Sequence, residues 1–166
     1  VLTVIDLIFN AGYTVGPSAG RDLCDEAIFL ARMLNDLRPA EPEVEGALAL
    51  LLVTHARRAA RVGADGETIA LTDQNRTLWD RAMQEEGLAL LDISLGRRAP
   101  GPFQIKAAIA ACQSQTPPDW PQIAALYAAL HRLEPTPVVR LNHAVALAET
   151  GDLAGALTLL ETLAPE

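Results

Sequence analysis

The sequence predicts an all-α fold of about seven or eight helices packed as helical hairpins, with a tetratricopeptide-like array in the C-terminal half. Apolar residues make up 50% of the 166 positions and recur mainly at the helical period. Proline and glycine separate these stretches, and runs typical of strands are almost absent. Because the length suits one compact domain with a sizeable core, we expect residues 1–166 to form a single helical domain.

Residues 1–62 are predicted to form the N-terminal helices of this domain. A first helix is expected to end where Gly12, Gly16 and Pro17 interrupt the apolar pattern. A second helix is expected from about residue 21 to 37, and a third from about 42 to 61. Their apolar stripes predict that the three helices pack against one another.

The third predicted helix carries charges that suit its two ends. Glu43 and Glu45 lie in its first turn. A basic cluster, Arg57, Arg58 and Arg61, lies near its last turn. Both placements are favourable to the helix dipole, so we interpret the cluster as a solvated helix end, with contact to an acidic partner surface as the alternative. The middle of the helix is almost wholly apolar and is expected to be buried.

A loop is predicted over residues 63–73, followed in 74–166 by an amphipathic helix and then by tetratricopeptide-like hairpins. Asp73 is the expected N-cap of the amphipathic helix. Apolar residues then recur at roughly helical spacing along one stripe, namely Leu78, Trp79, Met83, Leu88 and Leu91.

The C-terminal half has the spacing of paired helices in a repeat array. Ala144 and Ala156 are small residues that allow two helices to approach closely, and Gly151 suits a helix C-cap with positive φ. A shift of roughly 34 residues, the tetratricopeptide period, places Ala110 opposite Ala144. The register is imperfect, because Gln122 falls opposite Ala156. Repeats of this kind build concave surfaces that bind proteins.

Charge favours a protein partner over a nucleic acid. The chain has 21 acidic and 13 basic side chains, a net charge of -8, which repels phosphate backbones. The apolar start, VLTVIDLIF, is too short to span a membrane and lacks the basic residues of a secretory signal. We therefore expect a soluble cytoplasmic protein that binds neither nucleic acid nor membrane. Since the chain opens at Val1, we expect it to be a piece of a longer protein.

The sequence does not predict an enzyme, a cofactor or a metal site. His55, His131 and His143 are not paired at the spacing that puts two ligands on one helix face. Cys24 and Cys112 lie in apolar helical patterns, which indicates buried small side chains rather than reactive thiols. Phosphate-binding glycine motifs and a nucleophile elbow are missing as well.

The polar run before the stripe is the most particular part of the chain. It consists of Asp73, Gln74, Asn75, Arg76, Thr77, Leu78, Trp79 and Asp80. This sequence resembles the signature of the C-terminal extension found in one subgroup of extracytoplasmic-function (ECF) RNA polymerase sigma factors, in the sigma-70 superfamily.

Further segments resemble the same extension, in the same order along nearly the whole chain. They are LIFNAGYTVG at 7–16, RDLCDEAIFLARML at 21–34, PEVEGALALLLVTHARRAAR at 42–61, GPFQIKAAIAA at 101–111, DWPQIAALYAAL at 119–130 and PVVRLNHAVALAETGDLAGALTLLETL at 137–163. The polymerase-binding domain and the promoter-reading helix-turn-helix of a sigma factor are not in this sequence. The resemblance therefore implies a regulatory domain that acts in cis on transcription initiation, through the sigma factor's front domains, RNA polymerase or a signalling protein.

Two interpretations of the signature remain open. In the structural one, Asp73 caps the helix, Arg76 pairs with Asp80 at i, i+4 and Trp79 fills the core. In the functional one, Gln74, Asn75 and Arg76 stay partly exposed beside a groove and receive a partner. Other functions that fit the chain are a free-standing peptide-binding repeat scaffold and a small-molecule sensor, which would need a closed pocket with convergent polar groups.

Overall fold

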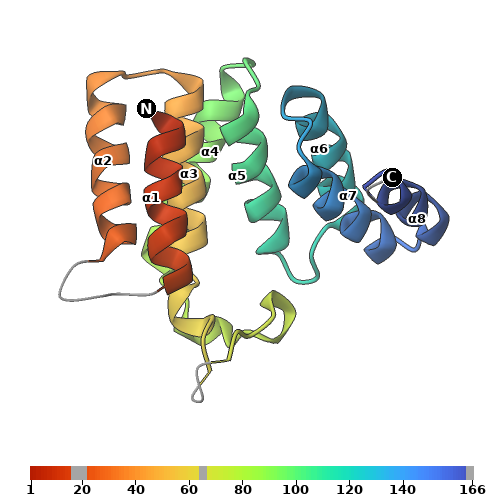
Figure 1. The fold of residues 1–166 in the computed structure, drawn as a ribbon. Coiled ribbons are helices and arrows are strands. Elements are labelled where there is room, and N and C mark those ends of the chain that lie inside the picture. The colour runs from red at the N-terminus through yellow and green to blue at the C-terminus, as the bar shows by residue number, and fades with distance from the viewer. Residues whose placement is uncertain (16–21, 64–66, 164–166) are drawn as a thin grey trace. The chain divides into compact units, whose positions relative to one another are not determined.

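The computed structural model describes residues 1–15, 22–63 and 67–163. Within these ranges the chain forms eight α-helices and no strand, so the predicted all-α class is confirmed (Figure 1). The chain divides into two compact units, Val1–Ala107 and Ala108–Glu166. Whether the two units act as one domain stays a prediction.

The helices follow one another with short connections. In chain order they are α1 (Leu2–Val15), α2 (Leu23–Leu37), α3 (Pro42–His55), α4 (Arg81–Gly96), α5 (Pro102–Gln113), α6 (Trp120–Leu133), α7 (Pro137–Glu149) and α8 (Leu153–Glu161). Three 3-10 turns lie between α3 and α4, namely η1 (Arg58–Ala60), η2 (Leu71–Asp73) and η3 (Arg76–Leu78).

The first unit is built from helices that pack in consecutive pairs, as predicted: α1 against α2, α2 against α3, and α3 against α4. The apolar stripes of these helices form its core, which contains Ile5, Phe9, Cys24, Ala27, Ile28, Ala31, Leu48, Leu51 and Leu52. Helix α3 is buried along almost its whole length, as its apolar middle predicts. It is therefore the central element to which the other parts of this unit attach.

Helix α2 begins later than the sequence suggested, with Asp22 as its N-cap. The Asp22 carboxylate accepts a hydrogen bond of 2.9 Å from the backbone N–H of Cys24. This end of α2 lies so close to α1 that a Cβ on Gly12 would come within 2.8 Å of the Cys24 backbone nitrogen. Gly12 is therefore required by close helix packing, and it lies inside α1 rather than interrupting it.

The predicted third helix was too long. It ends at His55, and a 3-10 turn replaces the α-helix expected up to Arg61. In a continuing α-helix the Ala56 carbonyl would accept from Ala60. Here it accepts a 2.7 Å hydrogen bond from the backbone N–H of Asp80 instead, and Ala60 bonds Arg57. A tertiary contact thus ends the helix where its local sequence would continue it.

The predicted loop at 63–73 is partly ordered into short structure. Val62 and Thr68 form an isolated antiparallel bridge, and η2 occupies the last residues of the predicted loop. Residues 64–66 lie outside the described part of the chain. The predicted loop is therefore correct in outline, with an isolated bridge and one 3-10 turn added.

The second unit contains the pairs α6–α7 and α7–α8. Gly151 ends α7 with φ of 91°, as predicted, and the amides of Gly151 and Asp152 bond the carbonyls of Ala148 and Leu147. This pattern is a Schellman motif, which closes the helix and turns the chain into α8.

The small residues predicted to sit between repeat helices are buried. Ala144 and Ala156 lie where α7 and α8 pack together, and Ala110 is buried as well. Gln122, which the repeat register places opposite Ala156, is exposed on α6. The repeat therefore breaks at the position where its sequence departs from the pattern. In the described part of the chain, no helix combines the length and hydropathy needed to cross a bilayer.

Candidate functional site

Residues 71–80, which contain the signature residues 73–80, form two 3-10 turns and not the first turns of a helix. The prediction that Asp73 is the N-cap is therefore wrong. Asp73 ends η2 on the surface, while Asp80 caps α4 by accepting a 3.0 Å hydrogen bond from the Met83 amide. The reason is that Gln74 and Trp79 have extended backbones, with ψ of 136° and 138°, which interrupt any helix before residue 80.

Gln74 is buried, although a partner-binding role predicted partial exposure. Its side-chain nitrogen donates to the Ile69 carbonyl at 3.3 Å and so holds η2 against the preceding strip of chain. Asn75 is exposed and caps η3, accepting hydrogen bonds from the amide and the hydroxyl of Thr77 at 3.1 and 2.7 Å. Gln74 and Asn75 therefore both stabilise the local fold of this segment through hydrogen bonds within the chain.

Trp79 is buried, with 7% of its surface exposed, as the structural interpretation predicts. The Arg76 guanidinium lies over its ring, 4.6 Å from the ring centre, in a cation–π contact. The predicted helical i, i+4 relation between Arg76 and Asp80 does not form, because η3 ends at Leu78 and α4 begins at Arg81. Arg76 thus covers the indole instead of extending a helix.

The basic cluster at the end of α3 is partly buried and engaged with α1 and the start of α2. Arg58 forms an ion pair with Asp22, and both side chains are about four-fifths buried, at 23% and 21% exposure. The Arg61 guanidinium donates to the Tyr13 carbonyl and lies 4.2 Å from the centre of the Tyr13 ring. The interpretation of this cluster as a solvated helix end is therefore wrong for Arg58 and Arg61.

Titratable groups beside the cluster are tuned by burial and by charge. Burial alone would raise the pKa of Asp22, but hydrogen bonds from Arg58 and the Cys24 amide outweigh it and hold the pKa below its usual value. Burial raises the pKa of the Cys24 thiol to about 11, so the thiol is a packed apolar group, as predicted. Burial lowers the pKa of His55 against the opposing effect of Asp25, whose carboxylate lies 3.3 Å away.

Unpartnered polar atoms gather at this end of α3. Seven buried side-chain nitrogen or oxygen atoms in the described residues have no hydrogen-bond partner there, and five of them lie between residues 55 and 79. These five are His55 Nδ1, Arg57 Nε, Arg58 Nη2, Gln74 Oε1 and Trp79 Nε1. Each such atom costs free energy when it is left without a partner, on the order of 1–3 kcal/mol. The cluster combines donors and an acceptor, which suits a polar partner such as a peptide segment.

An open pocket of about 480 Å³ adjoins the cluster. Its polar lining comes from His55, Arg58 and Asp80, and Leu78 and Met83 contribute apolar surface. All three polar groups already have partners, since Arg58 pairs with Asp22, Asp80 caps α4 and His55 Nε2 lies 3.3 Å from the Asp25 carboxylate. The part of the chain that the structure describes contains no group of three or more His, Cys, Asp or Glu side chains able to hold a metal ion.

The groups that anchor the basic cluster were not predicted from the sequence. Asp22 could have been found as an Asp directly before an apolar helical run, the usual signature of an N-cap. The Tyr13 ring and carbonyl carry no such signal, because they meet Arg61 only through the packing of α1 against α3. The structure therefore joins the signature segment to the α3 end, through the Asp80–Ala56 hydrogen bond, as one candidate site.

Comparison with known proteins places this site inside a family. Residues 1–95 match the family described as "Family of unknown function (DUF6596)". The chain belongs to this family. The matched residues include α1 to α3, the three 3-10 turns and all but the last residue of α4, and hence every residue of the candidate site.

A relative of the chain is an uncharacterized protein of Rhizobium meliloti (strain 1021). The two are 48% identical over 170 residues, which cover 98% of this chain and 40% of the relative. The chain thus spans less than half the length of the relative that it matches. No solved structure matches the chain.

Proposed function

We propose that this chain is the regulatory C-terminal extension of an ECF-type RNA polymerase sigma factor and modulates transcription initiation in cis. In this proposal the extension makes and breaks no covalent bond. It receives the sigma factor's front domains, and through them RNA polymerase or a signalling protein, in the cytoplasm. The candidate site at the end of α3, with the signature segment beside it, is the contact surface.

The observation that carries the proposal is the group of five buried polar atoms without partners between residues 55 and 79. Because these atoms are buried, a protein partner would pair with them only if their side chains turn outward on binding. Such a contact would remove the free-energy cost of leaving the atoms unpaired. Tryptophan and arginine are also the residues that most often dominate binding energy in such contacts. Trp79, Arg57 and Arg58 supply both types at one place.

Two further observations support the same proposal. The sequence of residues 73–80 resembles the signature of the sigma-factor extension, and these residues lie in the part of the chain that matches the family. The chain covers 40% of its relative, which leaves room in such a protein for further domains. The net charge of -8 is consistent with a domain that leaves DNA contact to other parts of the protein.

The two alternatives draw less support from the site. A small-molecule sensor needs a pocket whose polar groups are free to bind, but Arg58 and Asp80 are already engaged beside the pocket at the α3 end. A free-standing repeat scaffold would bind peptides through the second unit. The unpartnered atoms gather instead in the first unit, where six of the seven found in the described residues lie.

In vitro transcription with core polymerase tests the proposal. The full-length protein is compared with one that stops just before Val1, on a promoter that the full-length protein serves. We expect the truncation to change promoter-specific transcript severalfold in either direction. Equal transcript from the two proteins would reject a regulatory role in cis and leave partner binding by the isolated chain as the question.

A further inference from the structure

An apolar face covers one side of the α1–α2 pair, away from the candidate site. Six large apolar side chains on this pair are between 38% and 73% exposed, namely Val4, Leu7, Phe29, Leu30, Met33 and Leu37. A groove of about 460 Å³, lined entirely by apolar residues, runs between the two helices. Apolar patches on soluble monomers rarely exceed a few hundred Å², and larger ones mark interaction surfaces.

The charges at the two ends of this face differ in sign. Glu26 lies one helical turn before Leu30 on α2, and it is exposed. Arg38 lies at the other end, beside Leu34, and is exposed as well. The described structure gives neither side chain a hydrogen bond or an ion pair. Roughly 18 Å of helix axis separates the two charges, at 1.5 Å per residue.

This distribution of charge is complementary to itself. In a two-fold symmetric contact, residue i of one copy meets residue j of the other, and j meets i. If α2 of one copy lies antiparallel to α2 of a second copy, Glu26 of each lies opposite Arg38 of the other. Met33 then lies near the symmetry axis, with Leu30 and Leu37 on either side. One arrangement therefore buries the apolar middle of the face and pairs the charges at its ends.

We propose that this face binds a second copy of the chain, forming a two-fold symmetric dimer in which the α1–α2 pairs pack antiparallel. A basic peptide would meet Glu26 but would be repelled by Arg38 at the other end of the same groove. The candidate site at the end of α3 uses none of the residues of this face.

Sedimentation equilibrium of the 166-residue chain over a range of micromolar concentrations tests the dimer. We expect the apparent mass to rise with concentration from the 17.7 kDa of one chain toward twice that value. Met33→Glu, which brings two like charges together at the axis, is expected to weaken the dimer at least tenfold. Leu157→Glu, at an exposed apolar position on α8, is the control and is expected to leave it unchanged.

Charge reversal tests the orientation of the two copies. Glu26→Arg and Arg38→Glu are each expected to weaken the dimer severalfold, and the double variant is expected to restore it. Circular dichroism confirms that every variant keeps its helix content. A chain that stays monomeric at all concentrations would overturn the proposal. A double variant as weak as the single ones would overturn the antiparallel arrangement.

Discussion

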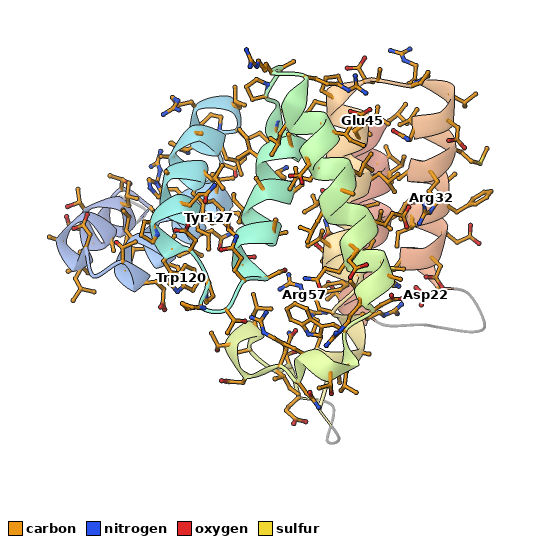
Figure 2. The ribbon with its side chains drawn as sticks, turned by 180° about the vertical axis from the view of Figure 1, so that it is seen from behind. Asp22, Arg32, Glu45, Arg57, Trp120 and Tyr127 are labelled. Carbon is orange, nitrogen blue, oxygen red and sulfur yellow. The ribbon has the colours of Figure 1, made fainter. Side chains whose placement is uncertain are left out.

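The two ends of helix α3 carry similar densities of charge and differ in how completely that charge is satisfied. Figure 2 shows Glu45 and Arg57 near these opposite ends. At the N-terminal end, Glu43 accepts hydrogen bonds of 3.0 and 3.1 Å from the backbone amides of Phe103 and Gln104. Glu45 is buried and makes two 2.6 Å hydrogen bonds with Arg97. None of these side chains is among the unpartnered groups.

The C-terminal end has the opposite character. Arg58 and Arg61 have partners, but Arg57 Nε, Arg58 Nη2 and His55 Nδ1 are buried without any in the described residues. Folding alone explains the N-terminal end, because its carboxylates cap α5 and neutralise an arginine. It does not explain the C-terminal end, where buried polar atoms oppose stability. The fold therefore accounts for the charges at the N-terminal end of α3, whereas it leaves buried polar atoms at the C-terminal end without partners.

The largest effect is expected from Arg97→Ala at the N-terminal end. The change leaves the buried Glu45 carboxylate without its ion-pair partner, so the free energy of unfolding is expected to fall. Urea unfolding followed by circular dichroism measures the loss. The double change Glu45→Leu with Arg97→Leu removes both charges and is expected to lose much less. An Arg97→Ala variant as stable as the wild type would mean that this end behaves as an ordinary surface pair.

A smaller, pH-dependent effect is expected from Asp22→Asn at the C-terminal end. Asparagine is as good an N-cap as aspartate, so the change removes mainly the ion pair with Arg58, at a cost of about 1 kcal/mol at neutral pH. The pKa of Asp22 is lowered on folding, so its carboxylate stabilises the protein above the unfolded pKa. This contribution is lost as the pH falls through the lower, folded pKa.

The stability difference between the wild type and Asp22→Asn should therefore narrow as the pH falls below the usual pKa of an aspartate and close once the pH lies below the lower, folded pKa of Asp22. Urea unfolding at neutral and acidic pH measures it. Asp92→Asn, at an exposed position of α4, serves as the control. A difference that grows toward acidic pH would contradict the assignment of the lowered pKa to the Arg58 pair.

The smallest effect on stability is expected from Arg57→Met. Methionine keeps the apolar stem and removes a buried nitrogen that has no partner, so the free energy of unfolding should stay constant or rise by up to about 1 kcal/mol. Regulation of transcription by the full-length protein should nevertheless fall. Arg132→Met, on the exposed end of α6, is the matched control for loss of charge. Clear destabilisation by Arg57→Met, with regulation intact, would assign Arg57 to the fold.

Helix positions could be predicted where residues close together in the sequence determine them. Apolar period and Pro42 located α3, and Gly151 located the end of α7. The end of α3 could not be predicted, because the Ala56 carbonyl is taken by Asp80, 24 positions later in the sequence. The start of α4 was missed for a related reason. Both Asp73 and Asp80 are good caps by sequence, and the extended backbones at Gln74 and Trp79 decide between them.

The candidate site was predicted only in part. The signature residues were found as a polar run of unusual composition, and burial of Trp79 followed from its place on the apolar stripe. Burial of Gln74 and the engagement of Arg58 with Asp22 depend on contacts between segments far apart in the chain. No spacing within the sequence encodes such contacts. Similarly, an atom is known to lack a partner only when its neighbours in space are known.

The indole N–H of Trp79 offers the most direct test of the central claim, that the α3 end receives a protein partner. The chain has two tryptophans, so its nitrogen–hydrogen NMR spectrum contains two indole signals, and Trp79→Phe identifies the one that belongs to Trp79. We expect this signal to shift when the proposed front domains of the sigma factor are added in trans. Binding that leaves the Trp79 signal unmoved, or no binding at all, would contradict this claim.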